Sequence, residues 1–189
     1  VSNFRKFKNL DSIIEAFAIF HRKFPDSKLI IVGENQLNNP RYKDQSAPRF
    51  RDVRDPKEII AKYGLQGSVL FTGSLNFEGV RDILSVSDIF VNNSDPETMG
   101  ISVYEAAAAG VPLCLSSIPS FTSVFGSRAL YSPPREPEKL AHVFEQYYRQ
   151  PALRESMKRE LQQFIKRFDY PVFMERIEEV YKGIITPLQ

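Results

Sequence analysis

The fold is decided by the stretch 89-IFVNNSDPETMGISVYEAAAAGVPLCL-115. A short apolar run at 89–91 predicts a buried strand, and the alanine-rich segment at 100–109 predicts a helix. A second apolar run at 111–115 predicts another strand. A strand, a crossover helix and a following strand form a right-handed βαβ unit, so we expect the two strands to be parallel.

The chain before this stretch continues the alternation. Apolar periodicity there predicts a helix over 10–20 with Asn9 or Asp11 as its cap, a strand at 28–33, a helix at 56–63, a strand at 68–72 and a helix at 77–86. Strands that alternate with amphipathic helices are typical of the α/β class. We therefore predict a Rossmann-like, doubly wound parallel sheet.

The last third of the chain has a different pattern. Apolar residues at helical spacing predict a C-terminal helical tail, with helices at 138–148, 152–168 and 172–183. The chain should then form a single domain, with a parallel α/β core over 1–135 and helices over 136–189.

Composition agrees with one globular domain and excludes some classes of partner. Of the 189 residues, 42% are hydrophobic and 25% are charged, and the net charge is +2. So small a charge does not indicate nucleic acid or an anionic membrane as the partner. The sequence has no apolar run of bilayer length and no leader, so we expect a cytoplasmic protein. Val1 stands in what reads as the end of a strand, which indicates a fragment of a longer protein.

Residue types that often carry chemistry have a structural interpretation here. Cys114, the only cysteine, lies in an apolar run, which favours a core residue over a nucleophile and excludes a disulfide framework. His21 and His142 fall on predicted helices, away from the loops that follow strands, and we interpret both as structural or surface residues. The sequence has no metal-ligand cluster, no Asp-x-Asp and no Walker lysine.

The segment 35–55 fits no element. It has no periodicity, contains two prolines, and carries five basic residues: Arg41, Lys43, Arg49, Arg51 and Arg54. It could be a binding lid, because long loops in compact domains are often functional. We favour a solvated insertion whose basic residues are offset by nearby aspartates.

The loops that follow the strands are the places to look for a site, because ligands bind at the carboxyl ends of the strands in such sheets. These loops are 2–9, 73–76 and 92–100. In the last of them, the backbone N–H groups of Gly100, Ile101 and Ser102 would begin a helix and would form an anion site.

Two glutamates flank this anion site. Glu97 precedes it and Glu105 follows on the second turn of the helix, so both carboxylates can face the same cleft. Carboxylates accept hydrogen bonds from vicinal sugar hydroxyls. Acidic residues near a helix N-terminus are also favoured simply by the helix dipole, and that interpretation competes.

The surrounding pattern resembles the retaining GT-B glycosyltransferases of family 4, also called group 1, whose hallmark is Glu, seven residues, Glu. The residues that carry the resemblance are Ser94, Glu97, Gly100, Glu105, Ala106, Gly110 and Pro112, with Met99 in place of the usual aromatic residue. The resemblance covers nearly the whole chain and implies the C-terminal, nucleotide-sugar-binding half of a GT-B fold. It also implies that residues 168–181 form a final helix that crosses back toward the other domain.

The resemblance implies a role for each matching residue. Glu97 would be catalytic and meet the donor sugar, and Glu105 would take the ribose hydroxyls. Lys8 matches the family's diphosphate-binding lysine. Asn3 stands where the family usually has arginine, so Arg5 or Lys6 would supply the second cation. The other donor contacts would come from Gly73 and Leu75 at the nucleobase, and from Ser94, Met99, Gly100, Ile101 and Ser102 around the sugar and phosphates.

We therefore expect metal-independent, retaining transfer of a hexose from a nucleoside diphosphate sugar, with no cofactor and no nucleic-acid partner. A glycan or glycolipid acceptor would bind through an N-terminal domain that this chain lacks, and the intact enzyme would act in polysaccharide or glycolipid assembly with peripheral membrane contact. Two alternatives stay open: a GT-B enzyme that epimerises or cleaves a nucleotide sugar, and a non-catalytic assembly module.

Overall fold

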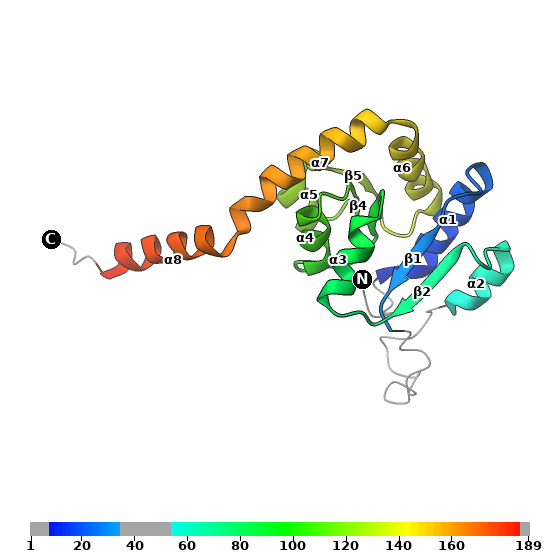
Figure 1. Cartoon of the computed structure of the whole chain (residues 1–189), viewed down its shortest axis with the longest axis horizontal. Coiled ribbons are helices and arrows are strands. Elements are labelled where there is room, and N and C mark those ends of the chain that lie inside the picture. The colour runs from blue at the N-terminus through cyan, green and yellow to red at the C-terminus, as the bar shows by residue number, and fades with distance from the viewer. Residues whose placement is uncertain (1–7, 35–53, 186–189) are drawn as a thin grey trace.

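The computed structural model describes residues 8–34 and 54–185 (Figure 1). The elements in chain order are α1 (Leu10–Lys23), β1 (Leu29–Val32), α2 (Pro56–Tyr63), β2 (Val69–Gly73), α3 (Phe77–Ser85), β3 (Phe90–Asn92), α4 (Ile101–Ala108), β4 (Leu113–Ser116), α5 (Pro119–Phe125), the 3-10 turn η4 (Gly126–Arg128), β5 (Ala129–Ser132), α6 (Pro137–Arg149), α7 (Pro151–Ile165), the 3-10 turn η5 (Lys166–Phe168) and α8 (Tyr170–Ile185). The predicted alternation of strands and helices, followed by three C-terminal helices, is confirmed.

Two elements were not predicted. The short helix α5 and the four-residue strand β5 occupy the stretch between the last predicted strand and the helical tail. The predicted helix at 152–168 is also interrupted, because α7 ends at Ile165 and the chain continues as η5.

The strands form a parallel layer in two parts. β1 pairs with β2, and β3, β4 and β5 pair in that order; every pair is parallel. Among the described residues, no backbone ladder joins β1 to β3. The expected single sheet is therefore not continuous in its hydrogen bonds.

Side-chain packing unites the two parts. One core cluster contains Ile31 of β1 and Cys114 of β4, and α1, α2 and α6 cover it. The other contains Val32 of β1 and Leu113 of β4, and α3, α4, α5 and α7 cover it. Helices thus lie on both faces of the layer, as the doubly wound prediction requires, and Cys114 is a fully buried core residue.

The helix α8 differs from the other helices because it extends away from the α/β body (Figure 1). It carries exposed large apolar side chains at helical spacing: Tyr170, Phe173, Val180, Tyr181 and Ile184. In the described part of the chain, no helix combines the length and the apolar character needed to cross a membrane.

Tyr147 connects the helix α6 to the strands β4 and β5 by hydrogen bonds. Its side chain is fully buried. Its hydroxyl donates to the Leu113 carbonyl at 2.8 Å and accepts from the Leu130 N–H at 3.2 Å. Burial raises the pKa of the Tyr147 phenol, so it stays protonated.

We expect Tyr147→Phe to lower the free energy of unfolding by about 1–3 kcal/mol, because the buried Leu113 carbonyl and the partly buried Leu130 N–H each lose a partner. Urea unfolding monitored by circular dichroism measures this. The neighbouring change Tyr148→Phe is the matched control. Tyr148 is exposed, so its loss should stay within about 0.5 kcal/mol. Equal effects of the two variants would contradict the role given to the Tyr147 hydroxyl.

Candidate functional site

The loop after β3 is built on buried polar side chains. The Asn92 Oδ1 accepts from the Ser94 N–H at 3.0 Å and from the Ser94 hydroxyl at 2.6 Å, while the Ser116 hydroxyl donates to the Ser94 carbonyl at 2.7 Å. Ser94 is fully buried. These hydrogen bonds hold Ser94 in the interior of the loop, where it sets the loop's shape.

An ion pair between Lys8 and Glu97 connects this loop to the start of α1. The two residues are far apart in sequence, and their side chains are only 21% and 12% exposed. The other carboxylate oxygen of Glu97 accepts from the Thr98 N–H at 3.1 Å. The structure thus brings together the residues that the sequence assigned to the diphosphate and to the sugar.

The N-terminus of α4 opens beside this loop. Gly100 is its N-cap residue, with φ 67°, and no side chain caps the helix. The first N–H groups, at Ile101 and Ser102, have no partner within the helix because a helix cannot supply one. Met99 and Ile101 are 57% and 66% exposed on either side of Gly100.

Gly100 is required for two reasons. A left-handed φ favours glycine, and a Cβ there would lie 3.0 Å from Phe121 and 3.2 Å from Val103. Both neighbours are fully buried, so neither can move aside easily. Phe121 belongs to the unpredicted helix α5. Because α5 packs so closely against residue 100, only glycine fits at the N-terminus of α4.

The remaining predicted site residues are spread along the same edge of the layer. Glu105 is partly buried on α4, and its carboxylate has no ion-pair partner among the described residues. Gly73 ends β2 with φ 70°, and its carbonyl accepts from the Gly33 N–H at 2.9 Å. Leu75 packs against the core cluster under α3. No hydrogen bond in the described part of the chain joins 73–75 to Glu97. Asn3 and Arg5, like Lys6, lie outside the described residues.

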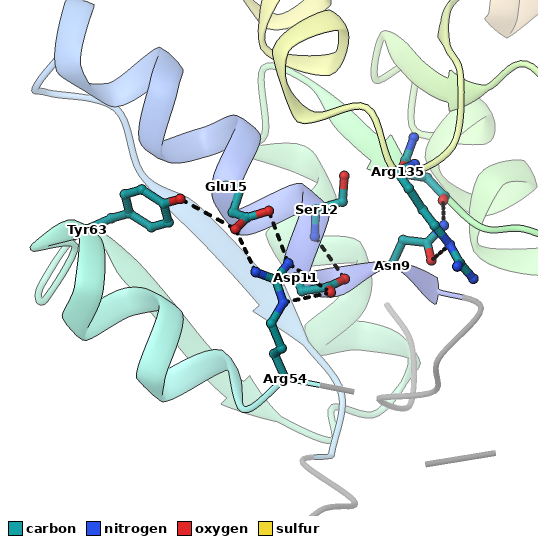
Figure 2. Close-up of polar contacts among 8 residues, drawn as sticks. Asn9, Asp11, Ser12, Glu15, Arg54, Tyr63 and Arg135 are labelled. Carbon is teal, nitrogen blue, oxygen red and sulfur yellow. Dashed lines mark hydrogen bonds and ion pairs between the residues drawn. The ribbon is translucent and has the colours of Figure 1, made fainter. Parts of the chain in front are cut away.

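Sequence reasoning missed a second layer of polar residues at this edge. Asn9 was expected only as a cap of the first helix, but its side chain makes no cap hydrogen bond. Its Nδ2 donates to the Asn93 carbonyl at 2.7 Å, and its Oδ1 accepts from the Arg135 Nε at 3.1 Å (Figure 2). An asparagine directly after a strand was a usable signal for Asn93, whereas nothing in the sequence marks Arg135.

A separate cluster ties the end of the 35–55 segment to α1 (Figure 2). The Arg54 guanidinium donates to Asp11 at 3.1 Å and to Glu15 at 2.8 Å, and the Tyr63 hydroxyl donates to Glu15 at 3.4 Å. The hydrogen bond from Arg54 lowers the pKa of the Glu15 carboxyl. Arg54 is therefore a structural residue, and the choice between an insertion and a lid concerns residues 35–53, which lie outside the described residues.

The histidine and acidic side chains of the described residues do not form a metal site. Within residues 8–34 and 54–185, no three His, Cys, Asp or Glu side chains gather closely enough to hold a metal ion. His21 bridges the Ser27 and Ser68 hydroxyls at 3.0 Å and 3.1 Å, which agrees with its predicted structural role.

Comparison with known proteins identifies the family. The profile described as glycosyl transferases group 1 matches residues 1–164. The chain belongs to the group 1 glycosyl transferases. Among curated relatives of this glycosyl transferase chain, the N-acetyl-alpha-D-glucosaminyl L-malate synthase of Bacillus anthracis is 30% identical over 112 residues, which are 59% of this chain and 25% of that protein.

Solved structures agree on the fold. A glycosyltransferase from Rickettsia africae superposes with a TM-score of 0.79 at 18% identity, over 99% of this chain and 47% of that one. The Anabaena protein Alr3699/HepE, solved with UDP-glucose, gives 0.78 at 19% identity, over 96% of this chain and 47% of that one. The glycosyl transferase chain therefore spans about half of these structures and has the predicted fold of one half of a GT-B protein.

The fit of Gly100 against Phe121 predicts the effect of a methyl group. Gly64 has nearly the same φ, 66°, and nothing lies within 4 Å of a Cβ there. Gly64→Ala in this glycosyl transferase chain should cost about 1–2 kcal/mol of unfolding free energy through backbone strain alone. Gly100→Ala should cost about 1–3 kcal/mol more, because it also overpacks the site. Urea unfolding of both variants tests this, and equal losses would show that Phe121 does not constrain residue 100.

Proposed function

We propose that this chain is the donor-binding half of a retaining glycosyltransferase and that it binds a nucleoside diphosphate sugar. The observation that carries the proposal is the Lys8–Glu97 ion pair beside the uncapped N-terminus of α4. A cation and unpaired helix N–H groups suit a diphosphate, and an adjacent carboxylate suits sugar hydroxyls. Membership of the family and the UDP-glucose in the related Anabaena structure support this choice.

Each residue has a place in the proposed complex. Lys8 and the N–H groups of Ile101 and Ser102 bind the phosphates, and Gly100 lets the backbone approach them. Glu97 is the catalytic residue that contacts the donor sugar. The donor's ribose hydroxyls donate to Glu105, and its nucleobase lies against the backbone at Gly73 and Leu75, with Met99 at the rim and Arg5 or Lys6 as a second cation.

The chemistry follows from these positions. As the bond from the sugar to the diphosphate breaks, negative charge grows on the diphosphate, and Lys8 and the α4 N–H groups stabilise it without reorganising. A metal ion is then not needed to hold the leaving group. The acceptor hydroxyl attacks the anomeric carbon from the face that the diphosphate leaves, and its proton passes to the leaving phosphate oxygen, so the configuration at that carbon is retained.

The acceptor belongs to the rest of the proposed enzyme. An N-terminal domain would bind a glycan or glycolipid acceptor, and the half-length match to solved structures leaves room for it. The exposed apolar side chains of α8 would pack against that domain. We expect this chain alone to bind the donor without turning it over, because both reactants must be positioned together. The whole enzyme would act in the cytoplasm, at or near the membrane, in polysaccharide or glycolipid assembly.

Calorimetric titration with UDP, GDP and ADP, with and without magnesium, tests the donor site. One nucleotide should bind in the absence of magnesium, and Glu105→Gln should weaken that binding by about 1–3 kcal/mol, the scale of a lost charged hydrogen bond. Lys8→Ala should weaken it as well. Glu138→Gln, an exposed change on α6, is the matched control and should leave affinity unchanged. Failure of all three nucleotides to bind would contradict the proposal and favour an assembly module.

The ion pair predicts an opposite effect for the other glutamate. A phosphate that binds Lys8 must compete with the Glu97 carboxylate. Glu97→Gln should therefore strengthen binding of the bare nucleoside diphosphate about 3- to 10-fold. The nucleotide sugar also loses its contact to Glu97, so its affinity should rise by a smaller factor or fall. Calorimetric titration of the wild type and of Glu97→Gln, each with the bare diphosphate and with the nucleotide sugar, measures both changes. Weaker binding of the bare diphosphate would show that Glu97 does not compete for Lys8.

A further inference from the structure

Asn9 and Arg135 share an unusual backbone conformation. In the part of the chain that the structure describes, they are the only residues other than glycine with positive φ, 49° and 62°. This conformation disfavours residues with a Cβ, and asparagine tolerates it better than arginine. The side chains of these two residues contact each other, so the arginine has a contact that offsets its strained backbone.

The Arg135 side chain completes a network of buried amides. Its Nε donates to the Asn9 Oδ1 at 3.1 Å, and its backbone N–H donates to the Asn93 Oδ1 at 3.0 Å. Asn9 and Asn93 are only 2% and 1% exposed, and the Asn9 Nδ2 donates to the Asn93 carbonyl at 2.7 Å. Among the described residues, Arg135 is the only donor to the Asn9 Oδ1, and a buried carbonyl oxygen needs one.

The network joins the two loops that meet at the site. Asn9 directly follows Lys8, and its carbonyl accepts from the Ile13 N–H at 3.1 Å, where α1 begins. Asn93 lies in the loop that carries Glu97. Arg135 comes from the turn between β5 and α6, at the same carboxyl edge of the layer. It therefore fixes the backbone from which the Lys8 side chain extends.

We propose that Arg135 is a positioning residue of the donor site and acts through Asn9 on the Lys8 ammonium. The inference rests on the proposed function, because it assigns a use to the position of Lys8. A direct contact between Arg135 and the phosphates is the competing interpretation, and a general role in folding is another. The three interpretations differ when Lys8 is removed.

The test is a double-mutant cycle of Arg135→Gly and Lys8→Ala, measured by calorimetry with the nucleoside diphosphate that the wild type binds among UDP, GDP and ADP. Glycine adopts a φ of 62° without strain, so the change removes the side chain and keeps the turn. Arg135→Gly should weaken binding about 3- to 10-fold in the wild type and by no measurable factor in the Lys8→Ala background. Arg149→Gln, at the far end of α6, is the control and should not change affinity.

Three outcomes decide the inference. A loss of affinity on Arg135→Gly in the wild type, with no loss in the Lys8→Ala background, supports the inference. An equal loss in both backgrounds, or no loss in either, overturns it while nucleotide binding by the wild type still supports the proposed function. If the wild type binds none of the three nucleotides, the proposed function fails and this inference fails with it. Thermal unfolding of Arg135→Gly provides the second measurement, since a purely structural role would lower the melting temperature and leave the affinity of the folded protein unchanged.

Discussion

Side-chain packing on both faces of the strand layer is the constraint on which the structure depends. The ladder is interrupted between β1 and β3 in the described chain, so the two strand groups keep their relative positions through the two core clusters. Parallel strands of one layer end at one edge. Because packing keeps them in one layer, the end of β2 and the loop after β3 lie at that edge, and the contacts of Lys8 and Asn9 with the latter loop place the start of α1 there too.

The Lys8–Glu97 pair sets a condition on any ligand of this edge. Both side chains are largely removed from water, and separating a partly buried pair leaves two charges that each need a new partner. A ligand that offers an anion to Lys8 and hydrogen-bond donors to Glu97, a short distance apart, satisfies both charges. A sugar bonded to a diphosphate has both groups, whereas a simple phosphate or a neutral sugar has only one. Under the proposed function, the pair would therefore favour the whole donor over either part of it.

Much of the fold was predictable because long apolar periodicities repeat. Residues such as Ile13, Phe17 and Leu140 recur at helical spacing and are all buried. The elements α5 and β5 were missed, because α5 spans only seven residues and β5, with the sequence Ala-Leu-Tyr-Ser, lacks the β-branched residues that mark β1 and β3.

Part of the candidate site was likewise predictable from the sequence, and part was not. The spacing of Glu97 and Glu105 and the position of Lys8 were readable from the sequence. Ser94 also matched the family pattern, but its burial and its hydrogen bonds to Asn92 and Ser116 appear only in the structure. The contact of Arg135 with Asn9 could not be predicted, since it joins residues far apart in sequence through backbone conformations that only the folded chain shows.

The position of Cys114 has a practical consequence. It is the only cysteine of the chain, it is fully buried in the middle strand β4, and it belongs to the core cluster that also includes β1. Burial raises the pKa of its thiol, so a thiol reagent reacts only with molecules in which the layer has opened. The protein thus carries a natural chemical probe of its own opening, one strand away from the loop with Glu97, and the labelling rate of Cys114 reports how often the core around β4 opens.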